Sequence, residues 1–164
     1  MKGMSIFRGA KFAAVILGAL AIAGCAKHDA DPTNAMGAAA APGSQQDFVV
    51  NVGDRVFFDT DSTDLSQQAR ATLDKQAEWL GHYSQYSFTI EGHADERGTR
   101  EYNFALGERR AQAVHDYLAA KGISPSRMRT ISYGKERPVA VCDDISCWSQ
   151  NRRAVTVLNG APTS

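Results

Sequence analysis

The chain has 164 residues, of which 43% are hydrophobic, and this length and composition are typical of one soluble globular domain with extensions. Its 18 basic residues balance 18 acidic ones, but three of the basic residues and none of the acidic ones lie in residues 1–24, so the remainder carries 15 against 18, a net charge of −3. Such a chain lacks the basic footprint that nucleic-acid binding requires, and we expect no nucleic-acid partner.

The first 24 residues have the features of an export signal. Basic residues precede an apolar run over residues 12–23, which is too short to span a bilayer as a helix but fits a secretory signal. The order Ile-Ala-Gly-Cys that follows resembles a bacterial lipobox, with Gly24 as the last residue removed and Cys25 lipidated. No aspartate follows Cys25, so we expect the acyl chains to anchor the protein in the outer membrane, with its domain facing the periplasm. The alternative is an ordinary signal peptide that happens to contain a cysteine.

A tether is expected between the lipid anchor and the folded domain. From Ala26 to about Gln46 the chain is rich in Ala, Gly, Pro, Ser, Asp and Asn and shows no periodicity, which is typical of a flexible segment. Such a segment has a root-mean-square span of roughly 25 Å and a full extension of roughly 70 Å. We therefore divide the chain into a signal peptide (1–24), a lipidated cysteine with its tether (25–46) and a domain (47–160).

Within the domain, hydrophobic periodicity predicts alternating strands and helices. The first helix has Ser66 as a plausible N-cap and Gly81 as its stop, and the second ends at Gly122. The pattern indicates an α+β fold, a two-layer sandwich with helices packed on one face of a mixed sheet, although the strand order cannot be derived from it. In chain order we expect a strand at 56–58, a helix at 65–80, a strand at 86–93, a helix at 100–121, a strand at 128–133, a loop to about 150 and a strand at 153–158.

The candidate site lies in the strand-loop-helix unit of residues 91–114. Asp95 stands at the end of the strand, and the helix that follows turns Asn103, Leu106 and Arg110 to one inward face. A buried arginine without an anionic partner would cost roughly 3 to 5 kcal/mol, and Asp95 is the nearest candidate. The two residues either form an internal ion pair that locks the loop onto the helix, or lie across a pocket that complements the zwitterion of an amino acid.

A family resemblance favours the pocket. Residues 48–159 resemble the peptidoglycan-binding domain of the outer membrane protein A-like family, whose motif is matched by Gly92, His93, Asp95, Gly98, Tyr102, Asn103, Leu106, Arg110, Ala111 and residues 151–154. The resemblance implies four main strands. It also implies that Asp95 and Arg110 clasp the diaminopimelate of the peptide stem and that Asn103, Leu106, Phe58 and Asp59 complete the pocket. We further expect His93 to support the pocket through a hydrogen bond. For Phe58 a place in the core is the alternative, and Ala94 and Gly107 depart mildly from the family pattern.

The order of anchor, tether and domain resembles that of lipoproteins that tie the Gram-negative outer membrane to the cell wall. This resemblance implies membership of the Tol-Pal system, with roles in envelope integrity and in constriction during division, and the periplasmic propeller protein TolB as a partner. A scaffold lipoprotein whose pocket does not bind peptidoglycan is the alternative.

Other chemistry finds little support in the sequence. Cys142 and Cys147 are expected to form a structural disulfide, because the protein is exported and their four-residue spacer differs from that of redox motifs. His93 and Asp95 match no zinc spacing, and the acidic residues at 59, 61 and 64 lack the calcium-binding loop. Neither a nucleophile with a base nor a pair of opposed carboxylates is evident. We therefore expect a binding module without catalytic activity, metal or cofactor.

Overall fold

The computed structural model describes residues 40–160, which form one compact unit with its own hydrophobic core. The expected signal peptide, Cys25 and most of the expected tether lie outside the described residues. In the described part, no helix is both long and apolar enough to cross a membrane.

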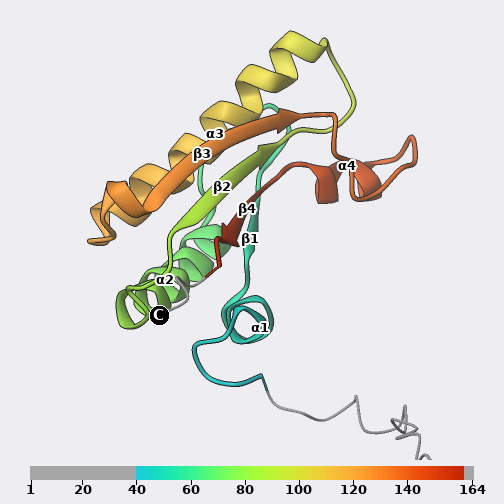
Figure 1. Cartoon of the computed structure of the whole chain (residues 1–164). Helices are drawn as coiled ribbons and strands as arrows, with labels where there is room; N and C mark the ends of the chain where they lie inside the picture. The colour runs from blue at the N-terminus through green and yellow to red at the C-terminus, as the bar shows by residue number, and fades with distance from the viewer. Residues whose placement is uncertain (1–39, 161–164) are drawn as a thin grey trace, which may run out of the picture. The chain divides into compact units, whose positions relative to one another are not determined.

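A four-stranded mixed sheet forms one layer of the domain (Figure 1). Its strands are β1 (Arg55–Phe57), β2 (Phe88–His93), β3 (Met128–Gly134) and β4 (Arg153–Leu158), in the order β1-β4-β2-β3. Strand β2 pairs with β3 in parallel and with β4 antiparallel, and β1 pairs with β4 antiparallel. The expected strands are thus all present, and the strand order, which the sequence could not supply, places β1 and β3 at the edges.

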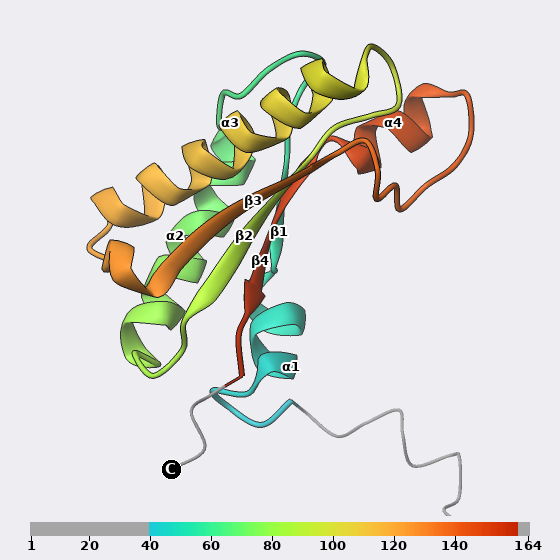
Figure 2. The ribbon, with the colours of Figure 1, turned by 45° about the horizontal axis from the view of Figure 1, so that its top comes forward.

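Two helices, α2 (Gln67–His82) and α3 (Arg100–Ala120), cover one face of this sheet (Figures 1 and 2), so the predicted two-layer α+β sandwich is confirmed. Ser66 caps α2 through its side chain as expected, but the helix continues through Gly81 and ends at His82. Thr99 caps α3, and Gly122, at a φ of 94°, follows its end. The core between the layers is formed by Leu73, Leu80, Phe88, Ile90, Val114 and Leu118.

Helix α3 approaches the sheet unusually closely because two glycines face each other. A Cβ atom on Gly92 of β2 would lie 1.8 Å from the backbone oxygen of Gly107 on α3. A Cβ atom on Gly107 would lie 2.4 Å from Oγ of Ser132, which donates a hydrogen bond to the carbonyl of Phe104. Gly107 therefore has a packing role that outweighs its cost in helix propensity.

The structured part begins before residue 47. The short helix α1 (Gln45–Asp47) has Ser44 as its N-cap and leads into the π-helical segment η2 (Phe48–Val52). Tyr86 donates a hydrogen bond to the carbonyl of Gly43, and the indole of Trp79 donates one to Asp47. Because these bonds attach residues 43–47 to the domain, the last residues of the expected tether belong to the fold.

The segment before β4 is not the plain loop that the sequence predicts. It contains the helix α4 (Ile145–Asn151), whose N-cap Asp144 accepts a hydrogen bond from the backbone of Ser146. Cys142 and Cys147 are joined by the expected disulfide, which links the preceding loop to this helix. A short 3₁₀ helix, η3 (Pro125–Arg127), also precedes β3.

Candidate functional site

The strand order brings the candidate site residues together at one end of the sheet. The end of β2 pairs with the start of β4, and the start of β4 pairs with the end of β1. The residues just beyond these ends, Phe58, Asp95 and Arg152, therefore meet although they are far apart in the sequence. Helix α3 lies alongside and contributes Arg110, whose guanidinium reaches the same end.

Four of the seven expected binding residues line one open cleft of about 250 Å³. We call it the Asp95 cleft, and its lining residues are Thr60, Asp61, Asp95, Arg97, Gly98, Tyr102, Asn103, Leu106 and Arg110. Tyr102 donates a hydrogen bond to Asp61 across this cleft. The amide of Asn103 donates to the carbonyl of Arg97 at 2.7 Å, and this bond ties the loop after β2 to α3.

Arg110 is held by backbone carbonyls rather than by a carboxylate. Its side chain is fully buried and donates to the carbonyls of Ser62 (2.9 Å), His93 (2.8 Å) and Asp59 (3.0 Å). Burial and the neighbouring charge of Arg152 lower the pKa of Arg110 to about 10, so the guanidinium stays charged at neutral pH. The direct hydrogen-bonded pair between Arg110 and Asp95 that one of the two interpretations required is not found in the described residues.

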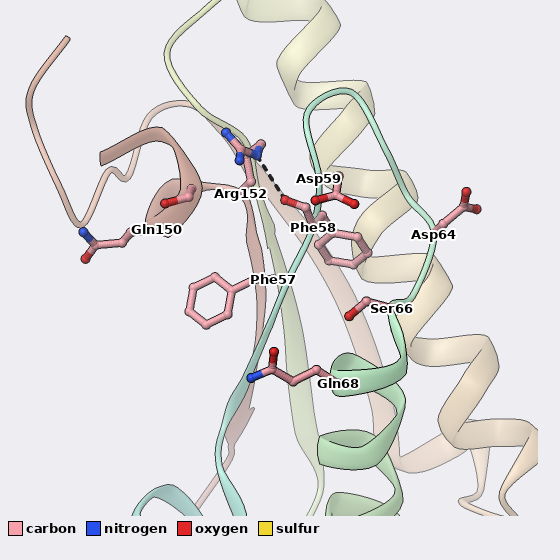
Figure 3. A pocket seen from close by; sticks show the side chains of 9 residues that line it. Phe57, Phe58, Asp59, Asp64, Ser66, Gln68, Gln150 and Arg152 are labelled. Carbon is pink, nitrogen blue, oxygen red and sulfur yellow. Dashed lines mark hydrogen bonds between the residues drawn. The ribbon is translucent and has the colours of Figure 1, made fainter. Parts of the chain in front are cut away.

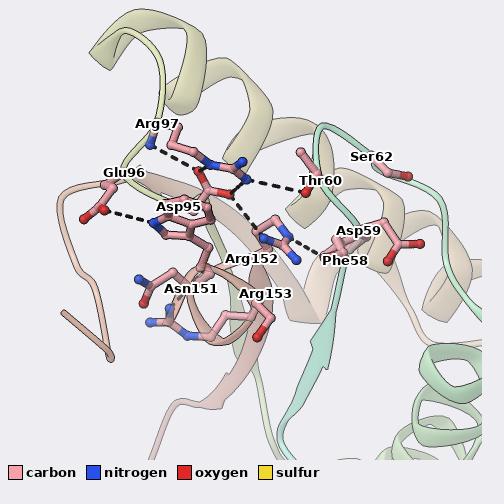
Figure 4. Close-up of polar contacts among 12 residues, drawn as sticks. Phe58, Asp59, Thr60, Ser62, Asp95, Glu96, Arg97, Asn151, Arg152 and Arg153 are labelled. Atoms are coloured by element: carbon pink, nitrogen blue, oxygen red, sulfur yellow. Dashed lines mark hydrogen bonds and ion pairs between the residues drawn. The ribbon is translucent and has the colours of Figure 1, made fainter. Parts of the chain in front are cut away.

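Asp95 instead pairs with two arginines that were not among the expected site residues (Figure 4). Arg97 donates to it through its backbone N–H (3.1 Å), its Nε (3.1 Å) and its Nη2 (2.7 Å), and Arg152 donates through Nη1 at 3.4 Å. Burial alone would raise the pKa of Asp95, but the hydrogen bonds from Arg97 and Arg152 outweigh it and hold that pKa below its usual value. Asp95 is therefore a stable carboxylate.

The Arg97 side chain forms the exposed wall of the Asp95 cleft. It is 40% exposed, and its guanidinium lies 4.2 Å from the ring centroid of Trp148 on α4. The indole N–H of Trp148 in turn donates to Glu96 at 2.9 Å. Helix α4, which sequence reasoning missed, thus helps to hold Arg97 against Asp95.

The other three expected residues, Phe58, Asp59 and His93, do not line the Asp95 cleft. Each contacts Arg110: Asp59 and His93 through their carbonyls, and Phe58 through its ring, whose centroid is 5.2 Å from the guanidinium carbon. The ring of Phe58 is buried in the hydrophobic core, as the alternative interpretation of this residue expects.

His93 supports the cleft through its backbone rather than its ring. Both ring nitrogens are buried and have no hydrogen-bond partner in the described part of the chain. Burial, together with the nearby positive charges of Arg153, Arg137 and Arg55, lowers the pKa of His93 to about 4. The imidazole is therefore neutral at physiological pH.

A second open cleft, of about 480 Å³, lies around the side chain of Phe57 (Figure 3). We call it the Phe57 cleft, and its lining residues are Phe57, Phe58, Asp59, Asp64, Ser66, Gln68, Ser149, Gln150 and Arg152. Phe58 and Asp59, which the family resemblance assigned to the pocket, line this cleft. Within residues 40–160, no group of three or more His, Cys, Asp or Glu side chains is placed to hold a metal ion.

The arrangement suits a zwitterionic ligand. A guanidinium has five N–H groups, and Arg110 uses three of them on carbonyls, which leaves one on each terminal nitrogen. Arg110 and Asp95 line the same cleft without bonding each other, so a cation and an anion lie side by side at this cleft. Such a pair can bind a carboxylate and an ammonium carried on one carbon atom.

Comparison with known proteins agrees with this description. The model of the OmpA family matches residues 57–152. A peptidoglycan-associated lipoprotein of Rhizobium meliloti (strain 1021) is 69% identical over 147 residues, which cover 87% of this chain and 84% of the relative. A crystal structure of the peptidoglycan-associated lipoprotein from Burkholderia pseudomallei superposes with a TM-score of 0.63 and 43% identity, covering 65% of this chain and 90% of that one.

The fold extends to more distant proteins. The C-terminal domain of Helicobacter pylori MotB (residues 125–256) has a TM-score of 0.62 at 20% identity, covering 66% of this chain and 86% of that one, and this likeness shows the fold alone. The chain belongs to the OmpA family, and within it to the group whose members are named peptidoglycan-associated lipoproteins.

Proposed function

We propose that this protein is an outer-membrane lipoprotein that binds peptidoglycan noncovalently, by holding the side-chain head group of diaminopimelate in the Asp95 cleft. The observation that carries the proposal is the buried, charged Arg110, which is fixed by three carbonyls and still has two N–H groups free of them. The names of the relatives, peptidoglycan-associated lipoprotein, point to the same polymer.

In this proposal Arg110 binds the carboxylate of the diaminopimelate head group. The carbonyls of Ser62, His93 and Asp59 fix the guanidinium before the ligand arrives, so little side-chain entropy is lost on binding. Hydrogen bonds between a guanidinium and a carboxylate are also stronger than those between neutral groups, particularly in a largely buried site.

Asp95 binds the ammonium of the same head group. Its Oδ2 is occupied at 2.7 Å by Nη2 of Arg97, so the ammonium must take the place of that terminal nitrogen. The backbone N–H of Arg97 bonds to the other oxygen, Oδ1, and keeps the carboxylate oriented during this exchange. The Arg97 side chain is partly exposed and can move into solvent without disturbing the core.

The first experiment is calorimetry on residues 39–164 with two synthetic stem peptides, one that contains diaminopimelate and one that contains lysine in its place. Lysine has the ammonium but lacks the carboxylate beside it, so it cannot use Arg110. Selective binding of the diaminopimelate peptide supports the proposal. If neither peptide binds, the cleft is not a peptidoglycan site, and the scaffold alternative becomes the better account.

Variants assign the binding to the cleft. Arg110→Ala and Asp95→Asn should each abolish retention on isolated sacculi, whereas Arg109→Ala should not, because Arg109 is exposed on the same helix and lines neither cleft. Arg110→Ala leaves three carbonyls without their donor and can lower stability, so thermal unfolding of each variant is measured in parallel. Asp95→Asn keeps the side-chain shape and is the cleaner test. Full retention of either variant on sacculi would contradict the assignment.

The remainder of the proposal concerns the anchor and the partner. We infer that Cys25 is lipidated after removal of residues 1–24 and that the tether lets the domain reach the wall, as part of the Tol-Pal system with TolB as partner. Incorporation of labelled palmitate into the parent chain but not into Cys25→Ala would support the anchor. Crosslinking in intact cells that captures no TolB would remove that partner.

A further inference from the structure

The Phe57 cleft adjoins the Asp95 cleft, and the two share their dividing wall. Asp59 lines the first and Thr60 the second, so the backbone between them separates the two hollows. Arg152 lines the Phe57 cleft and also donates to Asp95 and to the carbonyl of Phe58. A ligand that fills the Asp95 cleft and extends past this wall enters the Phe57 cleft.

An exposed aromatic ring dominates the Phe57 cleft. Phe57 is 47% exposed although its neighbours Val56 and Phe58 are buried, because alternate residues of a strand face opposite sides. In Figure 3 its ring stands between the side chains of Gln68 and Gln150, which come from α2 and α4. A flat apolar surface flanked by side-chain amides is thus open to solvent.

The polar groups of this cleft are suited to a neutral, hydroxyl-rich ligand. Two serines and two glutamines offer both donors and acceptors, and Asp59 and Asp64 offer carboxylate acceptors. Gln150 donates through Nε2 to the carbonyl of Ser146, and within the described part of the chain the hydrogen bond recorded for Gln68 involves its backbone carbonyl and not its side-chain amide. These groups can therefore serve hydroxyl and amide groups of a ligand.

The negative charge of the Phe57 cleft disfavours the peptide part of peptidoglycan. Its lining residues include two carboxylates and one cation, Arg152. This arginine already donates hydrogen bonds to the carbonyl of Phe58 and to the carboxylate of Asp95. A stem peptide carries carboxylates of its own, which these two aspartates would repel. A sugar is neutral, and its C–H face can pack on an aromatic ring while its hydroxyls bond to amides.

We propose that the Phe57 cleft is a subsite for an N-acetylated sugar of the glycan strand, next to the stem peptide that the Asp95 cleft holds. The proposal rests on the proposed function for its geometry, because diaminopimelate is the third residue of the stem. Two stem residues lie between it and the sugar, so two neighbouring clefts suit the two ends of one muropeptide. Phe57 stacks on the sugar, and Gln68 and Gln150 bind its hydroxyl and acetamido groups.

Calorimetry on residues 39–164 tests the subsite with two ligands, the diaminopimelate stem peptide alone and the same stem joined to its disaccharide. The parent should bind the disaccharide form about tenfold more tightly. Phe57→Ala should lose this difference while it binds the free stem as the parent does. The matched control is Phe104→Ala, which removes a phenylalanine of similar exposure (52%) that lines neither cleft, and it should keep the difference.

A second measurement gives an answer even if the stem peptide does not bind at all. Titration of the protein with N-acetylglucosamine disaccharide, followed by amide and side-chain NMR shifts, should perturb Phe57, Gln68 and Gln150, and Gln68→Leu should weaken that response. The proposal is overturned if the disaccharide leaves these signals unchanged, if the free stem peptide perturbs them instead, or if both ligand forms bind the parent equally.

Discussion

Removal of the Arg97 side chain tests how the Asp95 cleft opens. In Arg97→Gln, Oδ2 of Asp95 loses its closest partner at 2.7 Å and keeps Arg152 at 3.4 Å, so a ligand ammonium no longer competes with an internal cation. Because the Arg97 side chain is 40% exposed, the pair is partly screened by solvent and contributes little. We therefore expect the diaminopimelate stem peptide to bind Arg97→Gln about two- to fivefold more tightly than the parent.

The assay is calorimetry with the diaminopimelate peptide and with its lysine counterpart, at low and at moderate salt. Arg100→Gln is the matched control, since it also removes one positive charge from the same region, pairs with Glu136 and lines neither cleft. Comparison with this control variant accounts for long-range electrostatic effects of the lost charge on the ligand. Weaker binding by Arg97→Gln than by Arg100→Gln would refute the reasoning and would mean that Arg97 itself contacts the ligand.

Three further predictions concern stability. Gly92→Ala should lower the free energy of unfolding by about 1 to 3 kcal/mol, because its Cβ meets the backbone of α3, whereas Gly81→Ala, with no neighbour within 4 Å, should raise it by up to about 1 kcal/mol in denaturant titrations. Because the pKa of His93 is lowered from 6.5 to about 4, stability should fall by about 3 kcal/mol as pH drops through that range, and His93→Gln should flatten this part of the pH profile. Reduction of the Cys142–Cys147 disulfide should cost about 2 kcal/mol and lower the melting temperature, and a count of free thiols on the denatured, unreduced protein should find neither cysteine.

The long elements could be predicted because their periodicity is strong. Helix α3 and the four strands lie close to their expected bounds, since apolar positions recur at the helical or strand period. The short elements could not be: α1 has three residues and α4 seven, which is too few for a periodic pattern. The sequence predicts a helix stop at Gly81, but the backbone there stays helical, so glycine alone does not end a helix.

The site was predictable where a residue's position in its element decides its role. Arg110 was expected to lie inward because it shares a helix face with Leu106, and it is fully buried. Its partners were not predictable, because every residue has a carbonyl and the choice among carbonyls depends on tertiary packing. The same limit applies to Arg152, whose contact with Asp95 depends on the pairing of β2 with β4.

The separation of Arg110 from Asp95 bears directly on binding. A tight internal pair would oppose a zwitterionic ligand, because both charges would have to part before the ligand could use either. In this domain Arg110 keeps its three carbonyls and Asp95 exchanges only the Arg97 side chain, so the contacts that the ligand breaks all belong to one partly exposed side chain. Backbone carbonyls hold the cation in place without neutralising it, and its charge remains available to a carboxylate. Under the proposed function, such a site binds its ligand while Arg110 keeps its backbone contacts, which suits a reversible attachment to the cell wall.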